Sequence, residues 1–308
     1  MSMVVGSIHA DFYISVDRFP QVGETVIGSG FSVFPGGKGA NQAVGCARLG
    51  AETFMVGAVG GDDIGRAMVE NLKRNGVVVK HIFVDRSVHT GVAFILLNTE
   101  TGDNMIVVAP GADNSLKPHH VEKALEEEAQ RVRTLLVQLE IPLETVYAAL
   151  RKGKELGITT ILNPAPAKPL DESVYRYVDV IVPNRIELEQ LTGATVKSLD
   201  DVFRASEILV KHGVKAVVTT MGSLGAALVA QDVKKLVKAF RVRVVDTVGA
   251  GDAFCAGLAV AIGENMELEE AVRFANAVAA LKITRQGAQS VPTRAEVESL
   301  LEKESTST

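Results

Sequence analysis

Short apolar runs bounded by small or polar residues recur along the chain and predict buried strands. They lie at residues 3–8, 54–59, 134–138, 159–162, 178–182 and 216–220. Amphipathic patterns with a helical period lie between them, at residues 40–49, 65–75, 118–131, 143–156 and 200–212. Apolar strands that alternate with such helices predict a mostly parallel sheet covered by helices on both faces. No fixed-period repeat or Pro/Ser/Gly-rich linker divides the chain, so we predict a single α/β domain over residues 1–308.

Two segments break this rhythm, at residues 11–34 and 89–109. Both contain β-prone stretches with mixed polar and apolar positions, and turn signals at residues 20–23 and 101–104 interrupt them. No helical pattern separates these strands, so we expect them to pair antiparallel. A small sheet of this kind, standing off the main sheet, would form a lid over a site at the carboxyl ends of the parallel strands. The alternative is that these strands extend the edge of the main sheet.

Composition and charge exclude several classes of protein. The 308 residues include 37 acidic and 32 basic side chains, which gives a net charge of −5 and no basic block. Binding to nucleic acid or to a membrane surface is therefore not expected. Two cysteines without CxxC spacing, and no basic residue before Arg18, indicate neither a disulfide framework nor a signal peptide. These features predict a soluble cytoplasmic protein, and we expect the acidic run at residues 126–128 to be a solvated helix face.

The segment DTVGAGDAF at residues 246–254 carries the clearest chemical signal. A strand-like run at residues 241–245 precedes it, and a helix of small residues at 253–262 follows it. Glycines at a helix start leave backbone N–H groups free to bind a phosphate. Asp252 in the first turn could then accept a proton from an attacking hydroxyl. The alternative is an ordinary helix start after a glycine turn.

A second glycine turn, FPGGKGANQ at residues 34–42, leads into a helix that carries Lys38 and Asn41. It is not a Walker A loop, because Gly39 stands where Ser or Thr should follow the lysine. Lysine and asparagine at a backbone-rich turn are suited to hydrogen-bonding the hydroxyls of a small polyol. The alternative is a plain surface turn.

Two further strand ends carry polar residues. Asn184 and Glu187 share the first turn of a helix after the strand at 178–182, and could organise a hydrated Mg²⁺ beside phosphates. The TTMGSLG segment at residues 219–225 offers a glycine turn suited to a nucleotide. An ordinary helix start and a tight hairpin turn are the respective alternatives. All four segments follow strands, and strand ends of a doubly wound sheet converge on one edge, the usual place of a ligand cleft.

In this order the segments resemble the PfkB (ribokinase-like) family of sugar kinases. The matching motifs are GSIHAD at 6–11, GGKGANQ at 36–42, QLE at 138–140, NPAPA at 163–167, NRIE at 184–187, DTVGAGD at 246–252 and TRQGAQ at 284–289. The resemblance covers nearly the whole chain. It implies an α/β domain with a small β lid that is often the dimer interface. It also implies transfer of the γ-phosphoryl group of ATP to the 5-hydroxyl of D-ribose, with Mg²⁺.

The resemblance also implies roles for individual residues. Asp252 would be the general base, with the amides of Gly249, Ala250 and Gly251 as the anion hole. The sugar would contact His9, Asp11, Gly37, Lys38, Asn41 and Glu140. The nucleotide and its Mg²⁺ would lie beside Asn184, Glu187, Thr220, Gly222, Ser223, Gly225, Gly251 and Asn276. Potassium, an expected activator, would bind the side chains of Asp246 and Ser290 and the carbonyls of Val248, Lys282, Arg285 and Gly287.

Some positions depart from the family pattern. His9 stands where the family usually carries an asparagine that touches the sugar, and neutral imidazole offers only one donor and one acceptor. A kinase for 2-deoxyribose, another pentose or a nucleoside is therefore an alternative, as is a His9 that points into the core. Cys255 replaces a frequent asparagine, and Arg185 stands where an acidic residue is usual. A non-catalytic sensor on the same fold is the remaining alternative, although the presence of Asp252, Lys38 and Glu187 argues against it.

Overall fold

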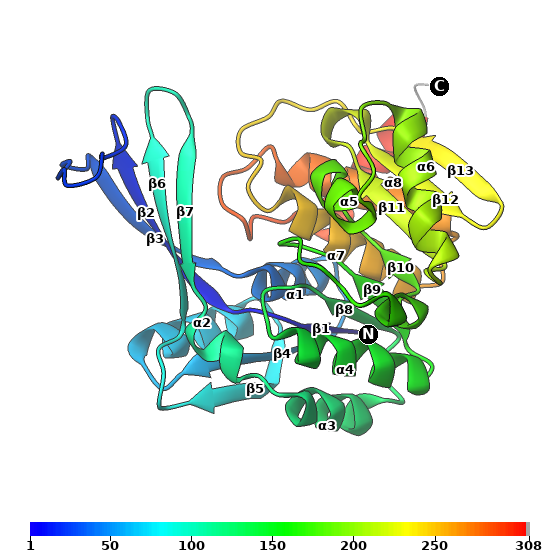
Figure 1. The fold of residues 1–308 in the computed structure, drawn as a ribbon, viewed down its shortest axis with the longest axis horizontal. Coiled ribbons are helices and arrows are strands. Elements are labelled where there is room, and N and C mark those ends of the chain that lie inside the picture. Colours follow the sequence, from blue (N-terminus) through cyan, green and yellow to red (C-terminus); the bar gives the residue numbers. More distant parts are fainter. Residues whose placement is uncertain (306–308) are drawn as a thin grey trace.

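Two β-sheets of different size organise the chain in the computed structural model, which describes residues 1–305 (Figure 1). The larger sheet has nine strands in the order β13-β12-β11-β10-β9-β8-β1-β4-β5. Its strands are β1 (Ser2–Val5), β4 (Thr53–Gly60), β5 (Val78–Asp85), β8 (Thr134–Val137), β9 (Thr159–Leu162), β10 (Val180–Ile181), β11 (Ala216–Thr220), β12 (Ala226–Ala230) and β13 (Val233–Val237). All neighbours from β11 to β5 pair parallel, and β12 and β13 add an antiparallel edge.

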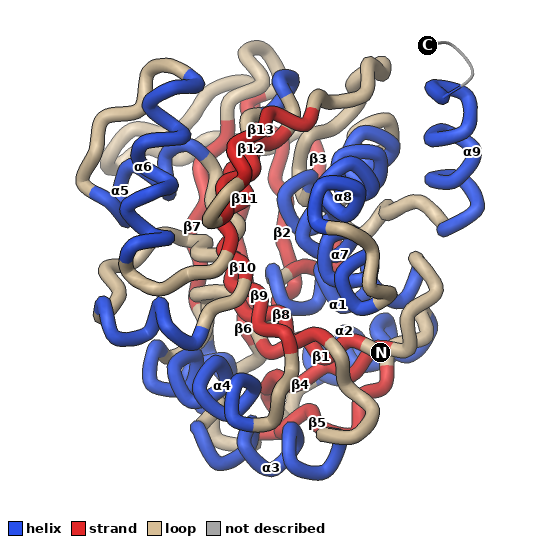
Figure 2. Tube along the Cα trace, turned by 90° about the vertical axis from the view of Figure 1, so that its right-hand side faces the viewer, coloured by secondary structure: helices blue, strands red, loops and turns tan. Residues whose placement is uncertain are grey.

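Helices cover both faces of this sheet, as Figure 2 shows. They are α1 (Lys38–Arg48), α2 (Asp63–Arg74), α3 (Pro118–Glu128), α4 (Leu143–Glu155), α5 (Arg185–Thr192), α6 (Leu199–Lys211), α7 (Ala250–Gly263), α8 (Leu268–Lys282) and α9 (Arg294–Ser305), with 3₁₀ turns η1 (Gly111–Ser115), η2 (Glu172–Tyr177) and η3 (Gly222–Leu224). Successive strand residues enter opposite cores: Val4 packs on the side of α1, α7 and α8, whereas Met3 and Val5 pack on the side of α3 and α4. The predicted mostly parallel sheet with helices on both faces is confirmed.

The smaller sheet stands apart from the large one, at the left of Figure 1. Its order is β3-β2-β6-β7, formed by β2 (His9–Val16), β3 (Gly30–Gly36), β6 (Gly91–Asn98) and β7 (Asn104–Ala109). The β2/β3 and β6/β7 pairs are antiparallel as expected, but the expectation is wrong for β2/β6, which pair parallel. The reason is that β1 and β5 run in the same direction, so β2 and β6, which follow them, leave the same edge of the large sheet side by side.

The expected strand at residues 241–245 is absent, and this segment is a loop. Val244 and Val245 are 56% and 60% exposed. The N–H groups of Val245 and Asp246 instead donate to the carbonyl of Ile283, at the end of α8. The apolar run therefore connects β13 to α7 across the end of α8.

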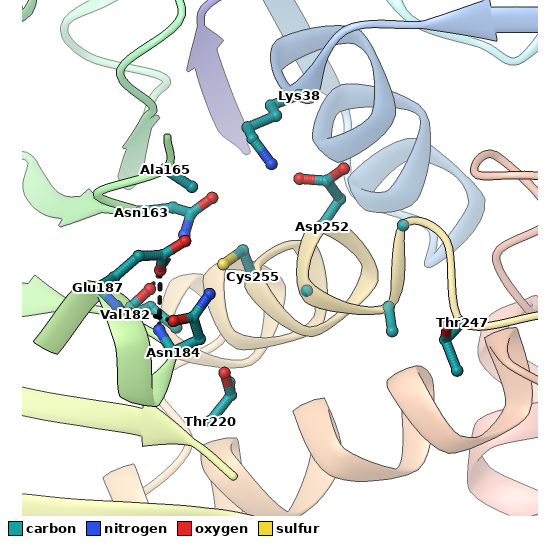
Figure 3. A pocket seen from close by; sticks show the side chains of 13 residues that line it. Lys38, Asn163, Ala165, Val182, Asn184, Glu187, Thr220, Thr247, Asp252 and Cys255 are labelled. Atoms are coloured by element: carbon teal, nitrogen blue, oxygen red, sulfur yellow. Dashed lines mark hydrogen bonds between the residues drawn. The ribbon is translucent and has the colours of Figure 1, made fainter. Parts of the chain in front are cut away.

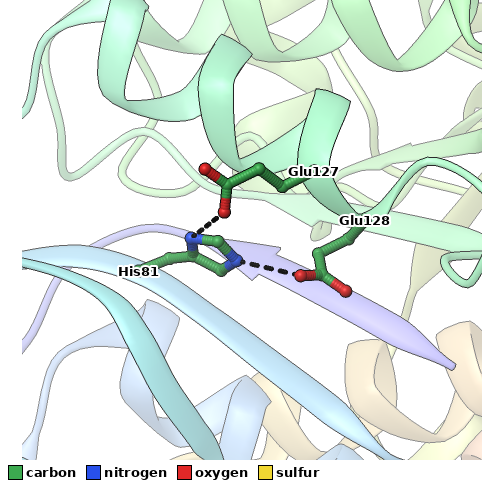
Figure 4. A group of neighbouring side chains, drawn as sticks. All are labelled: His81, Glu127 and Glu128. Atoms are coloured by element: carbon green, nitrogen blue, oxygen red, sulfur yellow. Dashed lines mark ion pairs between the residues drawn. The ribbon is translucent and has the colours of Figure 1, made fainter.

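A group of ion pairs joins β5 to the end of α3 (Figure 4). His81 lies between Glu127 and Glu128, and burial lowers its pKa. Glu128 pairs with Lys80 and, at 3.1 Å, with Arg131. The expectation of a fully solvated acidic run is wrong for Glu128, which is buried, because Lys80 and Arg131 neutralise its charge where α3 meets the sheet.

Among the helices of residues 1–305, none is both long enough and apolar enough to cross a bilayer.

Candidate active site

A cleft of about 220 Å³ opens at the carboxyl ends of the parallel strands. The chain order of the large sheet reverses between β1 and β8. The residues that line the cleft follow β9 and β10, end β11, or belong to α1, α5, α7 and the loop before α7. Crevices at such reversal points are the usual ligand sites of open α/β sheets. Figure 3 shows Lys38 and Asp252 on one side of the cleft and Asn184 and Glu187 on the other.

Asp252 lies in the first turn of α7, directly after the glycine turn. Gly249 caps this helix with a φ of 76°, and a Cβ there would lie 2.8 Å from the Cα and the carbonyl oxygen of Ala288. Glycine is therefore required to start α7 at this point. A Cβ on Gly251, in contrast, would meet no protein atom within 4 Å, and Gly251 lines the cleft. The backbone of the first turn of α7 is thus open to the cleft at Gly251, while the N–H of Ala250 donates to the carbonyl of Thr247 at 3.1 Å.

The Asp252 carboxylate is buried and held by two amides. Asn41 Nδ2 donates to Oδ2 at 3.0 Å, and Gln42 Nε2 donates to Oδ1 at 2.9 Å. Burial raises the pKa of Asp252, and the charge of Lys38 opposes this rise. The attraction of Asp252 in turn raises the pKa of Lys38. The two groups form a fixed acceptor and a fixed positive charge at the centre of the cleft.

The glycine turn before α1 holds a second acidic group. Glu140, after β8, accepts the backbone N–H of Lys38 at 2.9 Å and the hydroxyl of Ser7. Gly37 has a φ of 85°, and a Cβ there would lie 2.8 Å from the backbone nitrogen of His9, so β2 and this turn approach closely only because it is glycine. Burial raises the pKa of Asp11 to about 6, and the charges of Glu140 and Asp252 add to the rise.

Asn41, expected to contact the sugar, is engaged at both ends within the protein. Its Nδ2 donates to Asp252, and its Oδ1 accepts from Gln289 Nε2 at 3.1 Å. In this structure it orients the Asp252 carboxylate.

His9 is buried and pairs with a residue that the sequence did not point to. Its Nε2 lies 2.6 Å from Oδ2 of Asp113, whose Oδ1 accepts the N–H of Ile8 at 3.0 Å. Burial alone would lower the pKa of His9, but the hydrogen bond and charge of Asp113 raise it to about 8. Asp11 and Glu140 also act electrostatically on the ring, so His9 belongs both to the protein interior and to the acidic end of the site.

The residues expected at the nucleotide separate into two groups. Asn184 and Glu187 form a capping box at the start of α5, with reciprocal bonds of 2.8 Å, and both line the cleft with Thr220. Gly222, Ser223 and Gly225 form the turn between β11 and β12 and do not line it. Asn276 is buried, and its Nδ2 donates to the carbonyls of Val237 at 3.0 Å and Lys238 at 3.3 Å.

The residues expected at potassium come together, but they do not fit a bound ion. Asp246 accepts the N–H of Val248 at 2.9 Å with Oδ1 and that of Gly287 at 2.8 Å with Oδ2. Ser290 Oγ donates to the carbonyl of Gly287 at 2.7 Å. Lys282, expected to offer only its carbonyl, brings its ammonium group to within 3.0 Å of the Asp246 carbonyl. The expected side-chain ligands are thus already bonded, and a fixed cation lies among them.

Sequence reasoning assigned no role to Gln42, Gln138 or Asn163. Gln42 bonds to Asp252, to Asn163 Oδ1 at 3.1 Å and to Gln138, and Asn163 Nδ2 donates to the Val182 carbonyl at 3.0 Å. These residues lie within the matched motifs, but only their shared burial reveals the network. Cys255, one turn after Asp252, also lines the cleft.

The chain is similar to known proteins over nearly its full length. The family described as pfkB family carbohydrate kinase matches residues 1–294. The Bacillus subtilis ribokinase is 42% identical over 299 residues, covering 97% of this chain and 98% of that protein. A deoxyribokinase of Salmonella typhi is 38% identical and covers 93% of this chain and 94% of its own. The structure of Arabidopsis thaliana ribokinase complexed with ribose and ATP superimposes with a TM-score of 0.90 at 32% identity, covering 98% of each chain.

The match to the family extends over most of the chain, and relatives well above 30% identity span nearly its full length. The chain therefore belongs to the pfkB family of carbohydrate kinases.

Proposed function

We propose that this kinase transfers the γ-phosphoryl group of ATP to the 5-hydroxyl of D-ribose, giving ribose 5-phosphate and ADP. The observation that carries the proposal is the buried Asp252 carboxylate, fixed by two amides beside Lys38 in the first turn of α7. The Bacillus subtilis ribokinase and the Arabidopsis thaliana ribokinase complexed with ribose and ATP support the choice of substrates.

The proposed reaction uses Asp252 as the general base. Its carboxylate accepts the proton of the sugar hydroxyl while the hydroxyl oxygen bonds to the γ-phosphorus. The bond from that phosphorus to the bridging oxygen breaks, and ADP leaves. The N–H groups of Gly249, Ala250 and Gly251 stabilise the charge on the transferring group, as donors aligned before the reaction do in other transferases. Lys38 adds a positive charge on the same side.

The sugar lies, in this proposal, between Asp252 and the acidic end of the site. Asp11, Gly37, Lys38 and Glu140 hold its hydroxyls, and His9 adds a donor there. Asn41 keeps Asp252 in place, because both ends of its amide are bonded within the protein. These assignments rest on the shared position of the residues around the glycine turn before α1.

Magnesium fits the opposite side of the cleft. Glu187 uses Oε2 in the capping box with Asn184, so its Oε1 offers an oxygen ligand there, and hard cations such as Mg²⁺ prefer oxygen. Bound together with ATP, Mg²⁺ would neutralise part of the phosphate charge. Thr220 borders the same region, and we assign the turn at Gly222, Ser223 and Gly225 and the buried Asn276 to the outer border of the nucleotide. Potassium has no part in the proposed reaction, because its expected ligands do not fit it.

Two properties complete the proposal. A second copy of the chain covers the exposed apolar face of the small sheet, so the enzyme is a homodimer through its lid. A cytoplasmic location remains a prediction from the two cysteines, which are both free and buried.

A kinase specific for 2-deoxyribose is the second candidate. The Salmonella typhi deoxyribokinase supports it, as does His9 in place of the usual asparagine. A nucleoside kinase is the further alternative. A sensor without turnover is disfavoured, since binding alone does not need a desolvated carboxylate beside the anion hole.

The test is an ADP-release assay with Mg-ATP and D-ribose, 2-deoxyribose, fructose, adenosine or cytidine. We expect D-ribose to give the highest kcat/KM. Asp252→Asn should bind ribose, as measured by calorimetry, yet turn over about 10²- to 10⁴-fold more slowly. Asp232→Asn, in the exposed turn between β12 and β13, removes the same charge far from the cleft and should match the wild type. Full turnover by Asp252→Asn would contradict the assignment of the base, and absence of turnover with every acceptor would favour a sensor.

A further inference from the structure

Lys282 is the last residue of α8, and its side chain is completely buried. Its Nζ donates to the backbone carbonyl of Asp246 at 3.0 Å and lies 3.8 Å from Oδ2 of the same residue. An uncompensated buried ammonium would cost several kcal/mol. The Asp246 carbonyl and carboxylate compensate it, and the C-terminal end of α8 is itself favourable for a cation.

The same Asp246 organises the loop that leads into the anion hole. Its carboxylate accepts the N–H of Val248 on one side and of Gly287 on the other. Val248 directly precedes Gly249, the N-cap of α7. Lys282 is thus connected through Asp246 to the residues that hold Gly249, Ala250 and Gly251 at the cleft.

We propose that the ammonium group of Lys282 is a built-in monovalent cation of this kinase, and that it takes the place of potassium beside the Asp246 loop. An ammonium carries the charge of K⁺ and is bound by the same carbonyl and carboxylate oxygens. The ammonium charge would repel a second cation bound beside it. The inference rests on the proposed phosphotransfer, and it replaces the potassium activation implied by the resemblance.

The charge of Lys282 also interacts with Asp252, the proposed general base. Asp252 attracts it electrostatically, as does Asp246. Burial lowers the pKa of Lys282, and these two carboxylates act against this effect. A fixed positive charge behind the N-terminus of α7 stabilises the negative charge of the transferring phosphoryl group, as the backbone N–H groups of that turn do.

The first experiment needs no variant. Turnover of the wild-type enzyme with Mg-ATP and ribose is measured in potassium, sodium and tetramethylammonium chloride at equal ionic strength. We expect the same rate in all three salts. A severalfold rise in potassium would overturn the inference.

The second experiment removes the charge. Lys282→Met keeps the length of the side chain, and we expect it to be at least about tenfold slower in tetramethylammonium and to recover in potassium or ammonium. Lys235→Met removes an exposed lysine that pairs with Glu269 on the surface, and should behave as the wild type in every salt. Full activity of Lys282→Met in tetramethylammonium would contradict the proposed role.

Thermal unfolding gives a readout that does not depend on turnover. Replacing tetramethylammonium by potassium should leave the Tm of the wild type unchanged and raise that of Lys282→Met. If the wild type shows no turnover in any salt, the proposed function fails and this measurement still decides the inference. A Tm of the wild type that rises with potassium overturns it, even if Lys282→Met does not fold.

Discussion

The His9–Asp113 pair places a titrating charge next to the proposed sugar site. Since the pKa of His9 is raised from 6.5 to about 8, protonation favours the folded state. This contribution is complete below about pH 6.5 and is lost as the pH rises through about 8.

Asp113→Asn should remove this contribution. The asparagine keeps an oxygen for the N–H of Ile8 but no charge for His9, so burial should bring the pKa of His9 below that in the wild type. We expect the unfolding free energy of the wild type to fall more steeply between pH 6.5 and about pH 9 than that of Asp113→Asn. Urea unfolding at several pH values measures this, together with an NMR titration of the histidines. Asp232→Asn is the exposed control, and parallel pH profiles for wild type and Asp113→Asn would contradict the prediction.

At the scale of the element, two glycines at the start of α7 differ in the room they leave for a side chain: Gly249 has none, whereas Gly251 has open space. Gly251 faces open space in the cleft, and alanine is the better residue within a helix by about 0.5–1 kcal/mol. Gly251→Ala should therefore keep or raise the Tm, yet lower kcat because its methyl group enters the space of the transferring phosphoryl group.

Gly249→Ala is the comparison within the same turn. Its positive φ and the contact with Ala288 predict a loss of stability of about 1 kcal/mol or more. Thermal unfolding and steady-state kinetics on both variants test the contrast. If the two substitutions had equal effects on Tm and on kcat, Gly251 would be needed for stability and not for phosphoryl transfer, which would contradict the prediction.

The sequence predicted well those elements in which the local pattern of apolar and polar residues indicates which side chains are buried. The apolar runs form β4, β8, β9 and β11, and the amphipathic runs form helices, because apolar side chains favour buried positions. The prediction of a strand at 241–245 was wrong, because the local pattern does not show whether a partner strand is available. The parallel β2/β6 pair was missed because it follows from strand directions far apart in the sequence.

In the candidate site, too, features of the local sequence could be predicted and features that depend on distant contacts could not. Its glycine turns and Asp252 could be found from the chemistry of short motifs. Asp113 and the Lys282 side chain could not, because each acts through a partner more than 30 positions away. Neither lies in a motif that indicates its partner, so only the folded chain brings these charges together.

At the scale of the whole molecule, one face of the small sheet leaves several large apolar side chains exposed among the described residues. The pairing register places Phe12, Phe31, Phe94 and Val107 on the same face, with Phe12 stacked on both other rings. Phe31, Phe94 and Val107 are 64%, 49% and 69% exposed. Contiguous exposed apolar side chains of this kind mark interaction surfaces, and a second copy offers the same face.

Val107→Lys should convert the proposed dimer to a monomer. Val107 lies on the edge strand β7, so lysine there costs the fold little but places two desolvated charges in a symmetric interface. Light scattering should give twice 32.7 kDa for the wild type and 32.7 kDa for the variant. Val233→Lys, on β13 at one edge of the large sheet, should remain dimeric. Because the same sheet carries His9 and Asp11 at its base, the monomer should also show a higher KM for the sugar with little change in the KM for ATP. A wild type that is monomeric at micromolar concentration would contradict the proposed interface, whereas a dimeric Val107→Lys would place it on another surface.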